Sequence, residues 1–334
     1  MIRVRFAPSP TGSLHVGNAL SAAINRREGD WMLLRIDDTD PTRTVPRGEE
    51  AILDDLRWLQ IEWDEGPVRQ SERQDRYREV AAKLGETRFD GTTLLREDGT
   101  ATYHLASVVD DADFGITHVF RGNDHRPNEA LHRRLHEALG TTAPQYIHHG
   151  LILGEDGKKL SKRAEGATVA SLRELGFPAE AVRAYLKELG VPRHDVHYDL
   201  ARIRRLAVVA IGELSDEELA RRVDAPLEVV PAMRGARDLV EARRIAESIL
   251  AAPPEQPSAS PETLERFREL RERANGPLDP AAAKTIVREL KAVGGDLRAL
   301  RLALTGAERG PELWTVVLAL PRDEALRRID AATP

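Results

Sequence analysis

The chain has 334 residues, of which 41% are hydrophobic and 31% are charged, a composition typical of a globular protein with room for two domains. Its net charge is −6, and neither half is basic, so a nucleic-acid partner would need local basic patches. There is no cysteine, which excludes disulfides, thiolate zinc sites and cysteine nucleophiles.

The first 190 residues alternate between strand and helix patterns. Strands are predicted at 2–7, 31–36, 101–108, 117–120 and 146–149. Helices are predicted at 16–27, 47–59, 71–84, 127–139, 168–175 and 178–189. This alternation indicates a parallel sheet with helices on both faces. From about residue 199 only helical periodicity remains, interrupted by a Pro/Ser-rich linker at 253–261, so an all-α region is expected there.

Two short motifs, far apart in the chain, together predict a nucleoside triphosphate site. RFAPSPTGSLHVGN at 5–18 runs from an apolar strand through a Pro/Gly turn into a helix that begins near His15 and Gly17. Ligands of open α/β sheets bind beyond the carboxyl ends of the strands, and helix N-termini favour phosphate. The second motif, KKLSKR at 158–163, holds three of the seven lysines in the chain. Lysine supplies a compact point charge for a phosphate.

Acidic side chains cluster at two other places. Asp37, Asp38 and Asp40 follow the strand at 31–36 and could bind an amino group or order a loop through Asx turns. Asp110 and Asp111 follow the predicted strand at 101–108, and one is expected to be functional and the other structural.

Histidines form two further patterns. His132 and His136 have the i, i+4 spacing of a metal-binding helix face, but no third ligand lies nearby in the sequence, so we expect a solvated face. His149, at the end of a predicted strand, could reach a phosphate. The N-terminus has no apolar signal segment and the chain has no 18-residue apolar run, so a cytoplasmic protein without membrane contact is expected.

The His-x-Gly turn and the Lys-Leu-Ser-Lys loop resemble the two hallmark motifs of class I aminoacyl-tRNA synthetases. LRIDDTDPTR, GPVRQSERQDRY, TYHLASVVDD and GITHVFRGNDH resemble the glutamyl-tRNA synthetase branch across residues 1–190, and weaker similarities follow in the tail. The resemblance implies a Rossmann-type catalytic domain at 1–198. It also implies a helical region at 199–334 that contacts the tRNA stem and ends in a reduced anticodon-binding-like domain.

The resemblance implies that L-glutamate is activated by ATP as glutamyl-adenylate and transferred to the 3′ end of tRNA(Glu), with AMP and pyrophosphate as products. The implied catalytic residues are His15, Lys159 and Lys162. The implied ATP-binding residues are Pro8, Thr11, Gly12, His15, Gly17, Asn18, Leu160, Ser161 and Lys162. The implied glutamate-binding residues are Arg5, Ser9, Asp37, Tyr103, Ser107, Arg121 and His125. Mg²⁺ would accompany ATP, and neither a protein metal site, zinc nor DNA is expected. A monomer is expected.

The sequence departs from the family pattern in two respects. Residues 85–101 stand where the family inserts a whole domain that grips the tRNA acceptor end, and RFDGTTLLREDG predicts only a hairpin. Ser107 and His125 replace the family's usual amide and larger aromatic residue. An alternative is therefore a glutamate-activating ligase with another acceptor: a modified tRNA base, a small-molecule amine or a peptide. A non-catalytic paralogue is a third possibility, against which the intact phosphate ligands argue.

Overall fold

The computed structural model describes residues 1–85, 87–251, 253, 260–274 and 276–333, so most of the predicted linker at 253–261 lies outside the described residues. The chain divides into two compact units. The first comprises Met1–Glu174 and Val182–Leu200, and the second comprises Leu175–Ala181 and Ala201–Pro334. No helix in the described part of the chain is both long and apolar enough to cross a membrane.

Parallel strands form the centre of the first unit. β1 (Arg3–Phe6), β2 (Trp31–Ile36) and β3 (Glu65–Arg69) pair in the order β1-β2-β3. β6 (His118–Gly122) pairs with β7 (Gln145–His149), also in parallel. The Thr117 amide donates to the Arg3 carbonyl at 2.9 Å, which places β6 beside β1. All residues of β1 and β2 except the first of each strand are buried, which is typical of parallel strands that are covered on both faces.

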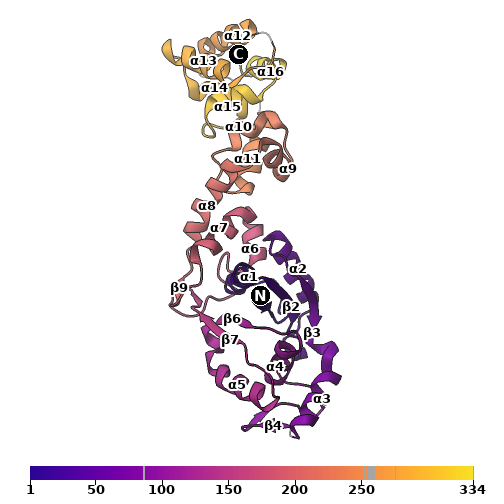
Figure 1. The fold of residues 1–334 in the computed structure, drawn as a ribbon. Helices are drawn as coiled ribbons and strands as arrows, with labels where there is room; N and C mark the ends of the chain where they lie inside the picture. The colour runs from indigo at the N-terminus through magenta and orange to yellow at the C-terminus, as the bar shows by residue number, and fades with distance from the viewer. Residues whose placement is uncertain (86, 252, 254–259, 275, 334) are drawn as a thin grey trace. The chain divides into compact units, whose positions relative to one another are not determined.

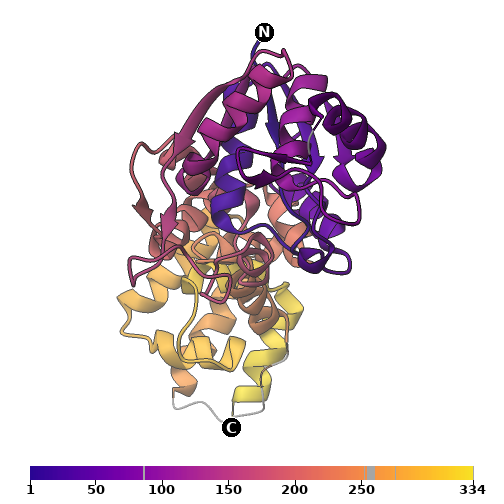
Figure 2. The ribbon, with the colours of Figure 1, turned by 90° about the horizontal axis from the view of Figure 1, so that it is seen from below.

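Helices flank these strands (Figures 1 and 2). They are α1 (Val16–Glu28), α2 (Gly48–Trp58), α3 (Gln74–Leu84), α4 (Tyr103–Asp113), α5 (Glu129–Ala138), α6 (Val169–Glu174) and most of α7 (Ala179–Leu189). α1 contacts β1, β2 and β6, while α4 contacts α3 and α5. Two short strands, β8 (Ile152–Leu153) and β9 (Val196–His197), complete the unit with a further parallel pair. The predicted parallel α/β class is confirmed.

One predicted strand was wrong, and β3 was not predicted. Residues 101–108 are not a strand, because α4 begins at Tyr103 and buries Leu105, Val108 and Val109 at helical spacing. The two β-branched valines in an apolar run produced the error, since a short apolar run does not distinguish a buried helix from a strand. The sequence of β3, EGPVR, contains a glycine and a proline and shows no alternation of apolar residues, so it gave no strand signal. The strand is only partly buried in the structure.

The predicted hairpin in segment 85–101 is confirmed. β4 (Arg88–Phe89) and β5 (Thr92–Thr93) pair antiparallel around Asp90 and Gly91, whose φ values are 48° and 76°. Two successive residues with positive φ are what a two-residue hairpin turn with right-handed twist requires. Leu94, directly after β5, is fully buried in the cluster formed by α3, α4 and α5. The hairpin is therefore fixed to the first unit by its own apolar residues.

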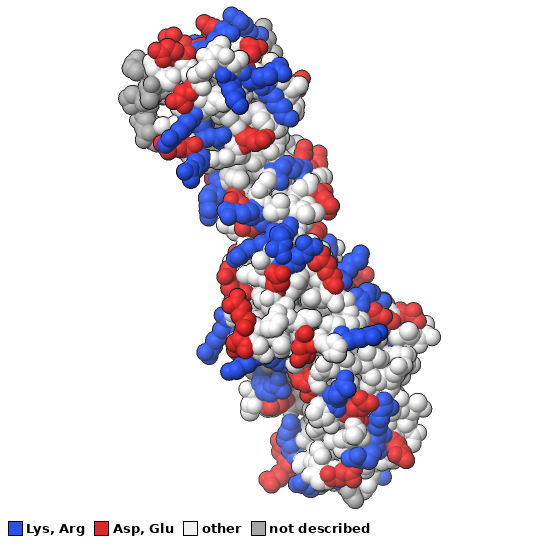
Figure 3. Space-filling view, turned by 90° about the vertical axis from the view of Figure 1, so that its left-hand side faces the viewer, with Lys and Arg blue, Asp and Glu red and all other residues white. Residues whose placement is uncertain are grey.

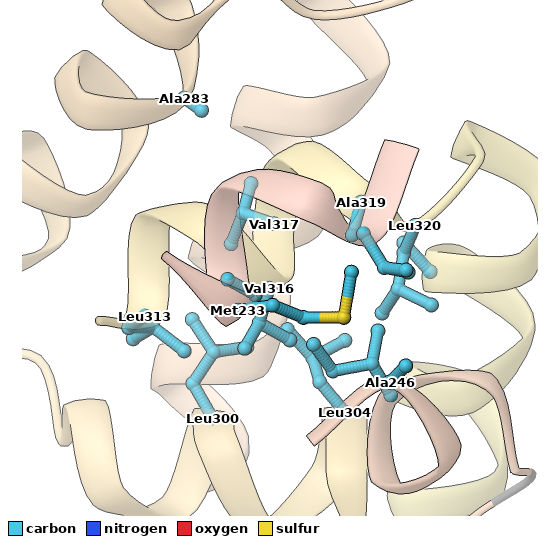
Figure 4. Packing of buried hydrophobic residues seen from close by; sticks show 14 of the residues in the cluster. Met233, Ala246, Ala283, Leu300, Leu304, Leu313, Val316, Val317, Ala319 and Leu320 are labelled. Carbon is cyan, nitrogen blue, oxygen red and sulfur yellow. The ribbon is translucent and has the colours of Figure 1, made fainter. Parts of the chain in front are cut away.

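From Leu200 onward the described residues form helices and no strand. They are α8 (Leu200–Glu213), α9 (Asp216–Val223), α10 (Val230–Met233), α11 (Leu239–Leu250), α12 (Pro261–Arg273), α13 (Pro280–Ala292), α14 (Leu297–Thr305), α15 (Leu313–Ala319) and α16 (Arg322–Ala332). Met233 packs between Leu300, Leu304 and Val316 in the core of the second unit (Figure 4). The predicted all-α region is confirmed.

Candidate active site

A cleft of about 580 Å³ opens where β1, β2 and β6 end, as expected for a ligand site of an open α/β sheet. The predicted site residues that line it are Arg5, Pro8, Ser9, Thr11, His15, Gly17, Asn18, Asp37, Tyr103, Arg121, His125 and Lys159. Gly12, Ser107, Leu160, Ser161 and Lys162 do not line it. The structure thus brings together most residues that the two motifs and the resemblance single out.

The turn after β1 is held in a defined shape. Gly12 has a φ of 92°, in the left-handed region that favours glycine. Asp55, which the sequence did not single out, is buried in α2 and accepts hydrogen bonds from the Leu14 amide and the Ser13 hydroxyl, both at 2.7 Å. Asp55 could have been recognised from the sequence as an aspartate on the apolar side of the predicted helix at 47–59. These bonds fix the chain just before His15.

His15 connects the two motifs. Its Nδ1 accepts a hydrogen bond from the Gly17 amide at 3.1 Å and caps α1, so the proton of the neutral ring lies on Nε2. Nε2 lies 2.7 Å from the Leu160 carbonyl oxygen and donates to it. Burial lowers the pKa of His15, and the positive charges of Lys159 and Lys162 lower it further. The ring is therefore a neutral donor aimed at the lysine loop.

The lysine loop lies against the first motif. Lys162 Nζ donates to the Thr11 carbonyl at 2.9 Å and to the Thr11 hydroxyl at 3.1 Å. Lys159 Nζ forms an ion pair with Asp124 at 2.5 Å. Burial lowers the pKa of Lys162. The Lys162 ammonium group therefore lies beside the glycine-containing turn, and Lys159 lines the cleft next to Asp124. Ammonium groups in these positions can neutralise a polyphosphate.

A buried arginine also lines the cleft. Arg121, on β6, is 6% exposed, and its Nη1 and Nη2 atoms have no hydrogen-bond partner among the described residues. Its Nε donates to His148 Nε2 at 3.2 Å, and the guanidinium lies over the Tyr146 ring, 4.7 Å from the centroid. Burial lowers its pKa. A buried guanidinium with two unpaired Nη atoms can bind a carboxylate through two hydrogen bonds.

Arg5 and Tyr103 also line the cleft. Arg5 Nε donates to Asp111 at 3.2 Å, which leaves its remaining N–H groups for a ligand. The Tyr103 hydroxyl lies 3.3 Å from His125 Nδ1, and burial raises the pKa of Tyr103. Two guanidinium groups and one phenol therefore converge on a volume suited to an acidic side chain.

The acidic side chains below the cleft belong to one buried ion-pair network. Arg35, fully buried on β2, donates to Asp37 at 2.7 Å and to Asp111 at 2.9 Å. Asp110 lies at the fully buried end of the network, 3.6 Å from Arg35 Nε. Ser107 is 1% exposed and accepts a hydrogen bond from Arg35 at 3.4 Å. It therefore belongs to the buried network and does not line the cleft. The signal for Arg35 was a single arginine within the apolar run WMLLRI.

Two sequence-based expectations need correction. Asp110 and Asp111 follow no strand, because they lie within α4. His132 and His136 are 1% and 0% exposed, so the solvated helix face expected for them was wrong. His132 Nε2 lies 3.2 Å from His104 Nδ1, so the two rings share a hydrogen bond. The His132 ring centroid lies 5.6 Å from that of Tyr103. Among the described residues, no three or more His, Asp and Glu side chains gather so as to hold a metal ion.

Comparison with known proteins shows the family to which the chain belongs. The family described as "tRNA synthetases class I (E and Q), catalytic domain" matches residues 1–87 and 82–204. Glutamate–tRNA ligase 1 of Rubrobacter xylanophilus is 33% identical over 430 aligned positions, which cover 99% of this chain and 97% of that protein. Glutamate–tRNA ligase 2 of Maricaulis maris is 31% identical and is covered to 97%, with all of this chain aligned. Both alignments are longer than this chain, so the relatives carry segments that it lacks.

Solved structures give the fold. The glutamate tRNA ligase of Elizabethkingia meningosepticum, crystallised with its amino acid, aligns with a TM-score of 0.79 at 24% identity over 99% of each chain. The glutamate-tRNA synthetase of Elizabethkingia anophelis aligns with a TM-score of 0.77 at 23% identity, again over 99% of each chain. At this level of identity the two similarities show that the folds are alike.

Proposed function

The chain belongs to the class I tRNA synthetases of the glutamate and glutamine branch, and we propose that it activates L-glutamate with ATP and transfers it to the 3′ end of a tRNA. In the first step a glutamate α-carboxylate oxygen attacks the α-phosphorus of ATP, forming glutamyl-adenylate and releasing pyrophosphate. In the second step a terminal ribose hydroxyl attacks the acyl carbon and releases AMP. The observation that carries the proposal is a single cleft that is lined both by residues of the two phosphate motifs, among them His15 and Lys159, and by Arg121, whose Nη1 and Nη2 atoms have no partner among the described residues.

At the phosphate end, the motif residues act by charge and position. Lys159 and Lys162 exchange their present partners, Asp124 and Thr11, for the ATP phosphates and neutralise the charge that develops as pyrophosphate leaves. His15 donates from Nε2 to Leu160 or, once the loop moves, to a phosphate oxygen. Gly17 lets the nucleotide approach the backbone closely. No covalent intermediate with the protein is needed.

At the amino-acid end, Arg121 and Arg5 bind the side-chain carboxylate of glutamate. Two charge-assisted hydrogen bonds from the free Nη atoms of Arg121 provide a planar fork that fits this group. Asp37 and Ser9 lie in the same cleft and receive the α-ammonium group, while Tyr103 and His125 form the wall. Glutamine offers an amide that cannot satisfy a buried cation equally well, so glutamate is preferred.

The remaining partners follow from this chemistry. Mg²⁺ would be bound mainly by the phosphate oxygens of ATP and by water, and Asp124, the partner of Lys159, is a carboxylate that lines the same cleft. The nucleic-acid partner is tRNA(Glu). Basic and acidic side chains are interspersed on the face shown in Figure 3, so tRNA contacts there depend on local groups of arginines. We further propose a cytoplasmic monomer.

Amino-acid-dependent ATP–pyrophosphate exchange in the presence of tRNA tests the activation step. Glutamate should support exchange, and glutamine and aspartate should support it poorly, because only glutamate places a carboxylate against Arg121. Equal exchange with glutamate and glutamine would contradict the assignment of the pocket. Exchange that is independent of any amino acid would contradict the reaction.

A further inference from the structure

The buried Arg121 is oriented by a histidine, whereas the other two buried arginines described in the first unit are oriented by carboxylates. Arg5 and Arg35 both donate hydrogen bonds to Asp111. Arg121 Nε donates to His148 Nε2 at 3.2 Å, and no described carboxylate forms an ion pair with Arg121. The Arg121 guanidinium is therefore held in place without being neutralised.

The strand register brings Arg121 to its acceptor. Arg121 and His148 are register partners in the parallel strands β6 and β7, and so are Val119 and Tyr146. Residues two apart on a strand point to the same face of a sheet. Tyr146 and His148 therefore lie on the same face as Arg121, whose guanidinium lies over the Tyr146 ring. The contact between Arg121 and His148 follows from the pairing of the two strands.

Glu129 favours one protonation state of the His148 ring. It is the first residue of α5, the helix between β6 and β7 in the chain, and its carboxylate lies 3.5 Å from His148 Nδ1. A neutral imidazole has one N–H group, and His148 Nε2 accepts from Arg121, so the proton lies on Nδ1 and faces Glu129. Glu129 is held in turn by Arg133, whose Nε donates to it at 2.8 Å.

The surroundings of His148 keep its ring neutral. The side chain is 4% exposed, and burial, followed by the charge of Arg121, lowers its pKa. Glu129 raises the pKa, whereas Arg126 and His149 lower it further. These groups lie on β6, on α5, on the segment between them and on β7 itself. Protonation of His148 at acid pH would place an N–H donor opposite Arg121 Nε and a second positive charge beside the guanidinium.

We propose that His148 is a positioning residue for substrate recognition: as a neutral acceptor held by Glu129, it orients Arg121 and leaves the Nη1 and Nη2 groups for the side-chain carboxylate of glutamate. The proposal rests on the proposed function. A carboxylate in place of His148 would also orient Arg121, but it would neutralise the charge that the substrate has to meet. A neutral imidazole fixes the guanidinium through Nε and preserves its full charge for the ligand.

The test compares two variants, His148→Leu, which removes the acceptor, and His148→Gln, which restores an acceptor that does not titrate. Glutamate-dependent pyrophosphate exchange in the presence of tRNA gives kcat and KM near neutral pH. His148→Leu should raise the KM for glutamate about tenfold, because Arg121 loses the hydrogen bond that orients it. The values of kcat and of the KM for ATP should stay within about twofold, and His148→Gln should behave nearly as the wild type. A general loss of structure would change all three constants together.

A double-mutant cycle and a pH profile test how His148 acts. In the Arg121→Met background, His148→Leu should have no further effect on kcat/KM for glutamate, because His148 acts through Arg121. Below about pH 6.5, kcat/KM should fall more steeply for the wild type than for His148→Gln, which has no ring to protonate. Glu129→Gln removes a charge that raises the pKa of His148, so its acid limb should move to lower pH. Arg133→Met breaks the ion pair of Glu129 from the other side and should not move the limb in that direction.

Binding measured without catalysis separates this proposal from the proposed function. Thermal unfolding is followed over a range of glutamate concentrations in the absence of ATP and tRNA. The concentration that gives half of the stabilisation should rise about tenfold in His148→Leu and stay near the wild-type value in His148→Gln.

The proposal is overturned if His148→Leu binds and activates glutamate as the wild type does, or if it loses as much kcat/KM in the Arg121→Met background as in the wild type. It is also overturned if the pH profiles of His148→Gln and the wild type coincide. A wild type that binds glutamate with the expected differences between variants but charges no tRNA would count against the proposed function and would support the role of His148.

Discussion

Replacing Arg121 with methionine should have opposite effects on activity and on stability. The guanidinium is 6% exposed, and its two Nη atoms have no partner among the described residues. Loss of two charge-assisted hydrogen bonds to the substrate, each worth about 1.5–3 kcal/mol, predicts a decrease of about 10²–10⁴ in kcat/KM for glutamate. Removal of a buried cation without a carboxylate in contact should stabilise the free protein by about 1–2 kcal/mol, even after the bond to His148 is lost.

Two assays measure the predicted loss of activity and the predicted gain of stability. Glutamate-dependent pyrophosphate exchange in the presence of tRNA gives kcat/KM, and thermal unfolding with and without glutamate gives the stability of the free and bound protein. Arg133→Met is the control, because Arg133 also lies over the Tyr146 ring, at 5.1 Å, but is half exposed and paired with Glu129. Glutamate should stabilise the wild type and the control and should fail to stabilise the Arg121 variant. Unchanged kcat/KM, or a less stable free variant, would refute the reasoning.

Three further results are expected. Lys162→Ala should slow adenylate formation by about 10²–10³, and an unchanged rate of pyrophosphate exchange would exclude its role at the phosphates. Asp111→Asn removes the anion that is shared by the buried Arg5 and Arg35. The variant should lose about 3–5 kcal/mol of unfolding free energy, measured by urea unfolding. A loss below about 1 kcal/mol would show that the network is not important for stability. Burial lowers the pKa of His132 to about 3, so the unfolded chain takes up a proton that the folded chain does not, and stability falls as the pH drops from 6.5 towards 3. His132→Gln should reduce that fall between neutral pH and about pH 4.5, whereas the exposed His194→Gln should not; equal curves for His132→Gln and the wild type would contradict this explanation.

Local patterns predicted most of the elements that carry the site. The strand at 31–36 and the helix at 16–27 agree with β2 and α1 to within one residue. Their sequences combine one clear periodicity with a recognisable end signal, which for α1 is the capping His15. The convergence of the His-x-Gly turn and the lysine loop also followed from the sequence, because both motifs have residue types that phosphate chemistry requires.

The predictions failed where contacts between residues far apart in the sequence determine the secondary structure or the burial of a side chain. α4 looked like a strand because Val108 and Val109 favour sheets, yet they pack against α3 and α5. His132 looked solvated because its helix is rich in charge, but its partner, His104, lies on another helix. Arg35 pairs with aspartates of α4 as well as with Asp37. Sequence spacing carries no information about such pairs, so the network below the cleft could not be anticipated.

Transfer of the glutamyl group tests the central claim most directly. Purified protein is incubated with ATP, Mg²⁺, labelled glutamate and unfractionated bacterial tRNA, and acid-precipitable label is counted before and after mild alkali. We predict label on tRNA that mild alkali releases, because a 3′ ester is labile under these conditions. Label that resists alkali, or no label despite glutamate-dependent pyrophosphate exchange, would show that the activated glutamate goes to another acceptor and would contradict the proposed function.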